Sequence, residues 1–352
     1  MAGLSLIQRD LPATRQRLSD WFACSFGGPV SVSELTQANP AVGYSSETLL
    51  FTVDSGSQSR DYVVRIPPSG GGLFPDYDLE GQTKTQELLH RHGVPTPSPL
   101  LYEPDQDWIG SKFLVMPRIV GHIPLDNVNA PDGWPARAGV DVQRRAQQSF
   151  LELLADIHRV PSIEAPWLRR TSGIGNAAEL NWWHDYARWA TDGRVPAQLE
   201  EAFAWLRDHR PTTEPEPSIS WGDARMANCI FDSEGTIVGA LDWELACVCP
   251  AEADVGWWLG TRRQTLEAMG ASDDEDLPGF DSRDALIARY EALLGRQLVD
   301  LEWYEMSAMV RMGCCIARAL ILLGNLGQTD PMFMQTPLLP TWAQQFMGIG
   351  DR

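Results

Sequence analysis

Three polar residues of one stretch, Asp223, Asn228 and Asp242, are of the types that phosphoryl transfer requires. Such a transfer depends on positioning and charge neutralisation more than on covalent chemistry by the protein. One carboxylate must accept the proton of the attacking hydroxyl, and hard oxygen ligands must hold the magnesium ions that bind nucleotide phosphates. Asp223 and, five positions later, Asn228 supply a base and an amide oxygen from one loop. Asp242 supplies a second carboxylate from the end of a facing strand.

Each of these residues also has an ordinary structural interpretation. Gly-Asp and Asp-Trp pairs are common in turns, and loop asparagines often cap backbone groups. Their combination favours a phosphoryl-transfer site over the structural interpretation. It consists of Gly-Asp, an asparagine five positions on, an apolar strand, a hairpin at 232–235, a second strand and then Asp-Trp-Glu. Arg225, two positions after the predicted base, is placed to neutralise charge on the transferred group.

The residues before this loop are expected to form a small antiparallel sheet. Apolar spacing predicts a helix at about 10–25 that ends in a Gly-Gly-Pro sequence. Extended segments then follow at 30–35, 49–53, 62–66 and 112–117, separated by polar turns. The turn at 43–46 contains Ser45 and Ser46, and its hydroxyl and N–H groups suit a phosphate. Most Gly-Ser turns are only hairpins, so this turn alone is weak evidence.

The second part of the chain is expected to be mainly helical. A helix predicted at 77–92 still belongs to the first part, and a hinge at 117–121 marks the change in composition. Apolar residues three and four apart then predict helices at about 141–160, 177–190 and 197–209, with more after the central loop. His158 is expected to be a structural hydrogen-bonding residue, because a single histidine has no metal geometry.

Composition and charge limit the classes of partner. With 352 residues, 43% of them hydrophobic, the chain is long enough for two lobes with real cores. Its net charge of −19 disfavours nucleic acid and anionic membranes. The apolar segment at 306–326 contains two arginines and is expected to be a buried helix. The six cysteines form no zinc pattern and the first residues lack signal-peptide character, so we expect a cytoplasmic protein, monomeric or homodimeric, with reduced thiols.

Together these features resemble the aminoglycoside phosphotransferase family, a branch of the protein-kinase-like fold that includes many small-molecule kinases. The catalytic loop of that family usually reads His-Gly-Asp-x-x-x-x-Asn, followed by a strand, a turn and x-Asp-Trp-Glu. This chain has Trp-Gly-Asp-Ala-Arg-Met-Ala-Asn at 221–228 and Leu-Asp-Trp-Glu at 241–244, and the likeness extends to the Leu-Ala-Asp-Ile-His segment before 159 and to 250–254. The resemblance implies an α+β, two-lobed fold. A small antiparallel-sheet lobe at 1–117 would bind the nucleotide, and a larger, mainly helical lobe at 118–352 would hold the catalytic loop and the acceptor site.

The resemblance implies ATP or GTP as the phosphate donor, with Mg²⁺, and it implies roles for the loop residues. Asp223 corresponds to the catalytic base that accepts the acceptor hydroxyl's proton, with Arg225 as its helper. Asn228 and Asp242 correspond to the magnesium ligands. Trp221 replaces the usual loop histidine. That residue is normally a packing element, so the replacement need not abolish catalysis.

In the first lobe, the resemblance implies that Arg65 holds the α- and β-phosphates and that Met116 to Ile119 form the adenine-binding hinge. Glu80 lies near the position of the helix carboxylate that pairs with this cation. Two departures from the family pattern matter here. Arg65 stands where lysine is usual, and the two differ in geometry. Gln82 competes with Glu80 for the helix position, and with Gln82 there the ion pair would be missing.

The small-molecule hydroxyl acceptor is open between two classes. The acidic chain suits an aminoglycoside or another polyamine, with Asp185 and Glu244 as candidate amine-binding carboxylates. The tryptophans of the helical part suit a macrolide, hydroxyacyl or lipid-like alcohol, although core packing is their more ordinary role. Two other functions also remain open: a nucleotide-binding pseudokinase that acts as a sensor or scaffold, and a globular protein with neither activity.

Overall fold

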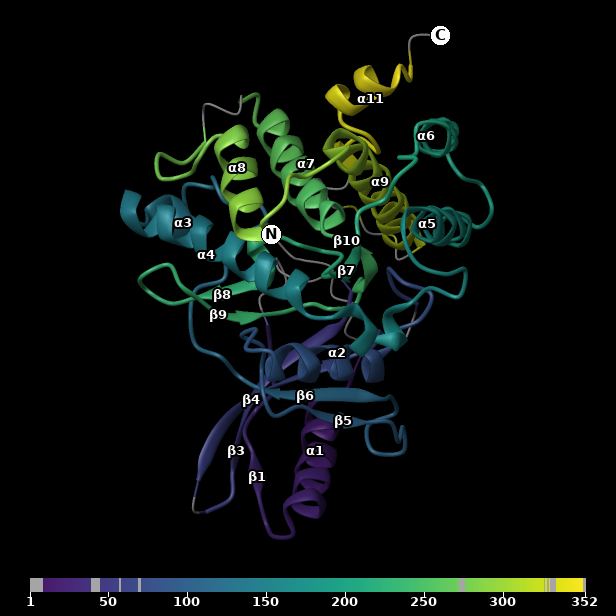
Figure 1. Cartoon of the computed structure of the whole chain (residues 1–352). Helices are drawn as coiled ribbons and strands as arrows, with labels where there is room; N and C mark the ends of the chain where they lie inside the picture. Colours follow the sequence, from purple (N-terminus) through teal and green to yellow (C-terminus); the bar gives the residue numbers. More distant parts are fainter. Residues whose placement is uncertain are drawn as a thin grey trace.

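The computed structural model describes residues 9–38, 45–56, 58–68, 71–271, 276–325, 327, 329 and 334–350. It is an α+β structure with two lobes, which Figure 1 shows at opposite ends of the molecule. The lobe at the bottom of that view contains a curled antiparallel sheet, and the lobe at the top contains most of the helices. The predicted fold class is confirmed.

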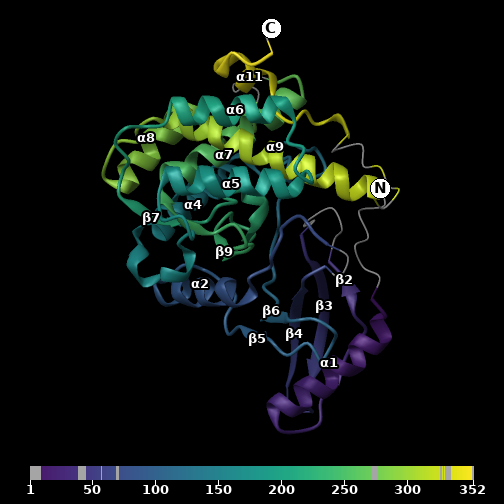
Figure 2. The same ribbon diagram turned by 90° about the vertical axis from the view of Figure 1, so that its right-hand side faces the viewer.

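A six-stranded sheet organises the first lobe. Neighbouring strands run in this order: β1 (Ser31–Val32), β3 (Glu47–Asp54), β4 (Ser59–Ile66), β6 (Phe113–Pro117) and β5 (Leu101–Glu103), with β2 (Thr36–Gln37) also paired to β3. Alternate residues of β3 are buried, as expected for a strand with one covered face. Helix α1 (Leu11–Phe26) covers that face, where Phe22 packs on Phe51 and Tyr62 and Trp21 packs on Phe113. Figure 2 shows this helix lying along the strands.

Helix α2 (Leu79–Arg91) contributes side chains to the cores of both lobes. Asp78 caps its first turn by accepting a hydrogen bond from Gly81 N at 2.9 Å. Leu79 packs under the sheet with Leu114 and Met116, whereas Leu88 and Leu89 belong to the core of the helical lobe. The chain leaves β6 at Pro117 and runs without long helices to α3 (Trp134–Arg137). The boundary predicted at 117 thus coincides with a strand end, although residues before it contribute to the second core.

The second lobe is a helical layer over two short strand pairs. Its long helices are α4 (Val140–Arg159), α5 (Asn176–Ala190), α6 (Ala197–Asp208), α7 (Glu252–Ala268), α8 (Arg283–Leu294) and α9 (Leu301–Asn325), followed by the short α11 (Thr341–Met347). The strand pairs are β7 (Pro217–Ser220) with β10 (Cys247–Pro250), and β8 (Cys229–Phe231) with β9 (Ile237–Ala240). The predicted helices at 141–160, 177–190 and 197–209 and the hairpin at 232–235 are confirmed, whereas β10 was not predicted.

Helix α9 is the apolar segment predicted to be buried. Its length and hydropathy would suffice to cross a membrane, and 61% of its most apolar window is buried inside the protein. It packs against α5, α6 and α7. Figure 2 shows it running through the helical lobe among these elements. The six cysteines, all among the described residues, are free thiols, and four of them are buried.

Candidate active site

A single buried carboxylate, Asp254, holds the backbone of the loop that carries Asp223. It lies in the first turn of α7 and accepts hydrogen bonds from Trp221 N at 2.6 Å, Gly222 N at 2.9 Å and Ser220 Oγ at 2.9 Å. His158 Nε2 donates to the same carboxylate at 2.9 Å, since a carboxylate only accepts. Burial alone would raise the pKa of Asp254, but His158 and the two backbone N–H groups hold it below its ordinary value. His158 is therefore a structural hydrogen-bonding residue, as expected.

Gly222 allows the loop to pass close to the facing segment. Its φ is +83°, a left-handed conformation that favours glycine, and a Cβ there would collide with the carbonyl group of Leu245. Arg311 of α9 donates from Nη2 to the Gly222 carbonyl at 2.6 Å. Its guanidinium also stacks on the rings of Trp183 and Trp257, at 4.9 and 4.6 Å from the ring centroids. The start of the loop is thus fixed from two helices.

Asp223 follows this fixed start, and both oxygens of its side chain are held. Oδ1 accepts from Arg225 Nε at 2.7 Å and from Trp257 Nε1 at 2.9 Å. Oδ2 accepts from Arg225 Nη2 at 2.7 Å and from Asn228 Nδ2 at 2.9 Å. Burial alone would raise the pKa of Asp223, but these partners, Arg225 first, hold it below its ordinary value. The side chain is therefore a charged, oriented carboxylate, as the predicted base role requires.

Arg225 joins this carboxylate to a second one. Its Nη1 donates to Asp126 Oδ1 at 2.7 Å, and Asp126 lies on the segment that connects the lobes. Attraction to Asp223 and Asp126 outweighs the opposing effect of burial and raises the pKa of Arg225 far above its ordinary value. The guanidinium is thus a permanent cation between two carboxylates.

Asn228 and Asp242 are brought together as the sequence predicted. The Nδ2 of Asn228 donates to the Asp223 carbonyl and carboxylate, which leaves its Oδ1 as the atom available to a cation. Leu241 N donates to the Asn228 carbonyl at 2.9 Å, which ties the two segments. Asp242 has a φ of +63°, uncommon outside glycine and a feature found often at functional sites. One amide and one carboxylate oxygen facing one cavity fit a magnesium ion that also binds phosphates.

Arg65 pairs with the second lobe and not with helix α2. Its Nη2 lies 2.9 Å from Asp242 Oδ1 and 3.7 Å from Glu244 Oε2. Glu80, in contrast, has a side chain 57% exposed and accepts from Lys84 Nζ, four residues along α2. Gln82, the competing residue, is buried. Of the two alternatives, this structure agrees with the one in which the helix ion pair is missing, because the first turn of α2 directs Glu80 to solvent.

Glu244 has an unusual environment for a carboxylate. Burial and the nearby Asp242 carboxylate raise its pKa to about 8, against the opposing influence of Arg65 and a hydrogen bond from Ser45. Its Oε2 has no hydrogen-bond partner among the described residues. Glu244 therefore belongs with the predicted phosphate-binding and metal-binding residues. Its predicted contact with an acceptor amine stays a prediction.

A cavity of about 930 Å³ between the lobes contains most of the predicted site residues. From the first lobe its wall includes Ser45, Ser46, Arg65 and Met116, from the connection after β6 Ile119, and from the second lobe Asp223, Arg225, Asn228, Asp242 and Glu244. Gly43, in the same predicted turn as the serines, lies outside the described residues. Ser45 is buried and Ser46 half-buried. Asp185 is exposed on α5 and is not part of this wall, so the structure does not bring it together with the other predicted site residues.

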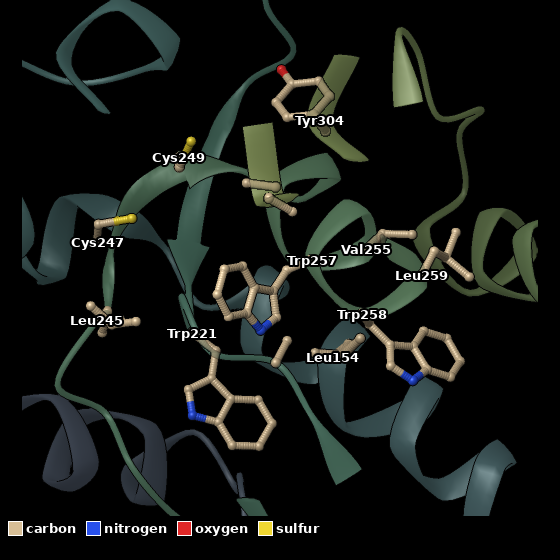
Figure 3. Close-up of a cluster of buried hydrophobic side chains, with 14 of the residues drawn as sticks. Leu154, Trp221, Leu245, Cys247, Cys249, Val255, Trp257, Trp258, Leu259 and Tyr304 are labelled. Atoms are coloured by element: carbon tan, nitrogen blue, oxygen red, sulfur yellow. The ribbon is translucent and has the colours of Figure 1, made fainter. Parts of the chain in front are cut away.

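Trp221, which replaces the usual histidine, joins the two halves of the motif. Its Nε1 donates to the carbonyls of Leu241 and Asp242 at 2.9 and 3.1 Å. Its ring stacks on Trp243 with centroids 5.1 Å apart. Figure 3 shows Trp221 in a buried cluster with Trp257 and Trp258 of α7. The packing role expected for this position is what the structure shows.

Sequence reasoning missed four residues of the site: Asp126, Asp254, Trp257 and Arg311. The sequence did point to Asp254, because this residue ends the Pro-Ala-Glu-Ala-Asp segment at 250–254, which also resembles the family pattern. The others act across long sequence separations. Trp257 reaches Asp223 from α7, and Arg311 reaches Gly222 from α9. The local spacing of residues does not predict such contacts, because they depend on how the helices pack.

Comparisons with known proteins place the chain in a family. A model of the phosphotransferase enzyme family matches residues 36–304. Among curated proteins, acyl-CoA dehydrogenase family member 11 of Pongo abelii is 28% identical over 264 residues, and that of Gallus gallus is 31% identical over 235 residues. These alignments cover 73% and 65% of this chain but only 32% and 28% of the relatives, so the chain spans about a third of their length.

Solved structures share the fold at low sequence identity. A Ralstonia eutropha protein described as an aminoglycoside phosphotransferase aligns with a TM-score of 0.67 and 20% identity over 91% of this chain and 93% of its own. Plasmodium vivax ethanolamine kinase gives 0.55 and 12% over 87% and 80%. A Streptomyces rimosus aminoglycoside phosphotransferase, in complex with ADP and streptomycin, gives 0.50 and 15% over 84% and 98%. At these identities the likeness concerns the fold alone.

Proposed function

The chain belongs to the phosphotransferase enzyme family, and on that premise we propose that it moves the γ-phosphate of ATP to a hydroxyl of a small molecule, with Mg²⁺. The observation that carries the proposal is the meeting of Asp223, Asn228 and Asp242 on the wall of one cavity between the lobes. A base and two oxygen ligands in one cavity are what phosphoryl transfer needs from a protein.

In the proposed reaction Asp223 orients the acceptor hydroxyl and takes its proton. The acceptor oxygen forms a bond to the γ-phosphorus, the bond from that phosphorus to the β,γ-bridging oxygen breaks, and ADP leaves with that oxygen. Asn228 Oδ1 and the Asp242 carboxylate would hold the magnesium ion, which supplies positive charge against the phosphate oxygens.

The first lobe is proposed to bind the nucleotide. Arg65, with Ser45 and Ser46 beside it on the cavity wall, would neutralise and position the phosphates. The backbone from Met116 to Ile119 lines the same cavity where β6 ends, and it would contact the base of ATP or GTP. A Streptomyces rimosus structure with ADP supports a nucleotide in this family's fold.

The acceptor that fits the cavity best is an alcohol with an apolar body. The cavity wall is more apolar than polar, although α7 also contributes Thr261, Gln264 and Thr265. The apolar side chains from α7, α9, the segment after Ile119 and the loop before α8 include Ile123, Leu125, Val128, Trp258, Phe280 and Met312. Four carboxylates line the described cavity, and each lies within ion-pair distance of Arg65 or Arg225. Each of them already has an arginine as its partner, so the amines of an acceptor such as an aminoglycoside would have to compete with Arg65 and Arg225 for these carboxylates.

The curated relatives support one kind of apolar alcohol. Their name, acyl-CoA dehydrogenase family member 11, refers to acyl thioesters. We therefore propose a hydroxyacyl thioester as the first acceptor to test. A hydroxyacyl chain would place its apolar part against the wall described above and its hydroxyl at Asp223.

The direct test is transfer of labelled phosphate from ATP and Mg²⁺ to a panel of alcohols: hydroxyacyl thioesters, choline, sugars and aminoglycosides. Asp223→Asn, which preserves the shape of the base, is the control. We expect transfer to a hydroxyacyl thioester and its loss in the variant. Transfer only to aminoglycosides would overturn the acceptor class, and no transfer to any alcohol, with no ATP hydrolysis above the variant, would overturn the proposed enzyme.

A nucleotide-binding pseudokinase is the second candidate. It is favoured by one observation, the ion pairs of Arg65 with Asp242 and Glu244, which occupy both the predicted phosphate cation and a predicted metal ligand. A ligand that binds only the folded protein raises its melting temperature. Stabilisation by ATP and Mg²⁺ without turnover of any alcohol would therefore support the pseudokinase.

A further inference from the structure

The base Asp223 has no acceptor position left for a substrate hydroxyl in this structure. A carboxylate offers about four lone-pair sites. Four donors occupy them, two on each oxygen: Arg225 Nε and Trp257 Nε1 on Oδ1, and Arg225 Nη2 and Asn228 Nδ2 on Oδ2. A hydroxyl that is to transfer its proton to Asp223 must first donate a hydrogen bond to it. One of the four donors must therefore leave before the proposed reaction.

Two of these donors are fixed by their surroundings. Trp257 is buried in α7, with its ring stacked on Arg311. Asn228 is buried three positions after Arg225 and also donates to the Asp223 carbonyl. Neither side chain can withdraw without disturbing the packing of the loop. The removable donor is Arg225, which has a long side chain, 28% exposed, and lines the cavity.

Arg225 also has a second carboxylate that can keep it in place when it turns. Nη1 lies 2.7 Å from Asp126, whose side chain is 48% exposed and also lines the cavity. The bidentate contact with Asp223 uses Nε and Nη2 instead. Rotation about the Asp126 contact would free both of these N–H groups together, since the guanidinium is rigid and planar.

What would draw the guanidinium away is an anion in the same cavity. Planar, bidentate N–H donors match a phosphate as well as a carboxylate. The predicted magnesium ligands Asn228 and Asp242 line the cavity with Arg225, so a metal-bound nucleotide would bring its terminal phosphate to this region. A nucleoside diphosphate lacks that phosphate.

We propose that Arg225 is a latch on the catalytic base. It is bound to Asp223 in the empty site, and it releases Asp223 only when the γ-phosphate of a bound nucleoside triphosphate replaces Asp223 as the partner of Arg225. The acceptor hydroxyl then finds two free positions on Asp223, and Asp126 is the positioning residue about which Arg225 turns. The latch rests on the proposed function, because it requires a nucleotide in this cavity. It couples the order of binding to chemistry, with the triphosphate first and the alcohol second.

The test is NMR of the arginine Nε–H groups in the full chain, with AMP-PNP and Mg²⁺ or ADP and Mg²⁺ as probes. Arg225→Lys and Arg65→Lys assign the two signals by their loss. We expect the Arg65 signal to move with both nucleotides, because both carry α- and β-phosphates. We expect the Arg225 signal to move with AMP-PNP and to stay at its position in the free protein with ADP.

The outcomes separate the latch from the function on which it rests. An Arg225 signal that stays in place with AMP-PNP, or that moves equally with ADP, while the Arg65 signal moves, overturns the latch and leaves the proposed phosphotransferase intact. If neither nucleotide moves the Arg65 signal or raises the melting temperature, nucleotide binding itself is wrong, and the latch is overturned with it.

Discussion

The two walls of the cavity are held by different kinds of interaction. On the side of the catalytic loop, the backbone before Asp223 is fixed by hydrogen bonds to the buried Asp254, none of which involves a predicted ligand-binding group. On the side of the sheet, Arg65 is held by Asp242 and Glu244, and Asp242 is a predicted metal ligand. The backbone of the first wall is therefore preorganised, and the Arg225 side chain is the part of that wall proposed to move, whereas Arg65 on the second wall is held by the predicted ligand groups themselves and must exchange partners when a metal-bound nucleotide enters. We therefore expect substitutions that disturb the backbone of the first wall to reduce stability and phosphotransfer most.

The largest effect is expected from Asp254→Asn. The asparagine amide would bring an N–H group next to the N–H groups of Trp221 and Gly222, which need an acceptor. The loss of these hydrogen bonds should lower the free energy of unfolding by about 3 kcal/mol. Movement of the loop should also reduce phosphotransfer about 100-fold, as misplaced catalytic groups do. Urea denaturation and initial rates measure the two effects. Glu252→Gln is the matched control, because Glu252 is also buried in the first turn of α7 but contacts Arg296 and Val299 away from the loop. Equal loss of activity in the two folded variants would show that Asp254 has no special role.

The pH dependence of stability sharpens this prediction. The pKa of Asp254 is below its ordinary value in the folded protein, so its contribution is complete above the unfolded pKa of about 4 and is lost as the pH falls through the folded pKa. His158 and Tyr290 are the other titratable groups facing it, and His158 bridges them. The stability difference between wild type and Asp254→Asn should be constant from pH 7 to about 5 and should shrink below about 4. A difference that persists unchanged to pH 3 would mean that charge on Asp254 is not what the variant removes.

Gly222→Ala is expected to have the next largest effect. A left-handed φ costs an alanine about 1–2 kcal/mol, and the new Cβ would also meet the Leu245 carbonyl, so the loop must move. Gly93→Ala is the control, since Gly93 has a φ of +87° and no atom lies within 4 Å of the place that the alanine methyl group would occupy. Both variants should lose stability in thermal denaturation, but only Gly222→Ala should lose most of its phosphotransfer rate. Similar rates in the two would show that the close approach at Gly222 does not position Asp223.

The same contrast explains what could be predicted from the sequence. The loop at 220–228, the hairpin after it and the places of Asp223, Asn228 and Asp242 depend on contacts within about twenty residues, so their spacing carries the geometry. The roles of these residues, like those of Ser45 and Ser46, are still predictions. The partner of Arg65 is 177 positions away, and only the packing of the lobes decides between Asp242 and a carboxylate on α2. The position of Glu80 in the predicted helix suggests a pair with Arg65, but Glu80 lies on the side of α2 that faces solvent.

Arg65→Lys should have a smaller effect than either loop variant. A lysine keeps the charge but lacks the planar fork that matches phosphate oxygens, so we expect the KM for ATP to rise about tenfold with little change in kcat. Arg60→Lys, an exposed position on the same strand, is the control. Steady-state kinetics at varied ATP concentration measures both. A fall in kcat with unchanged KM would place Arg65 at the transferred phosphate instead of at the α- and β-phosphates.

The smallest effect is expected from Glu80→Gln. Glu80 contacts Lys84 at the surface of α2, and exposed pairs of this kind contribute little to stability. The KM for ATP should stay within about twofold of the wild-type value, as in the control Glu87→Gln on the exposed side of the same helix. A clear rise in KM for Glu80→Gln alone would mean that Arg65 leaves Asp242 for Glu80 when the nucleotide binds. That result would still agree with the exchange of partners on this wall, but it would make α2, and not the phosphates alone, the new partner of Arg65.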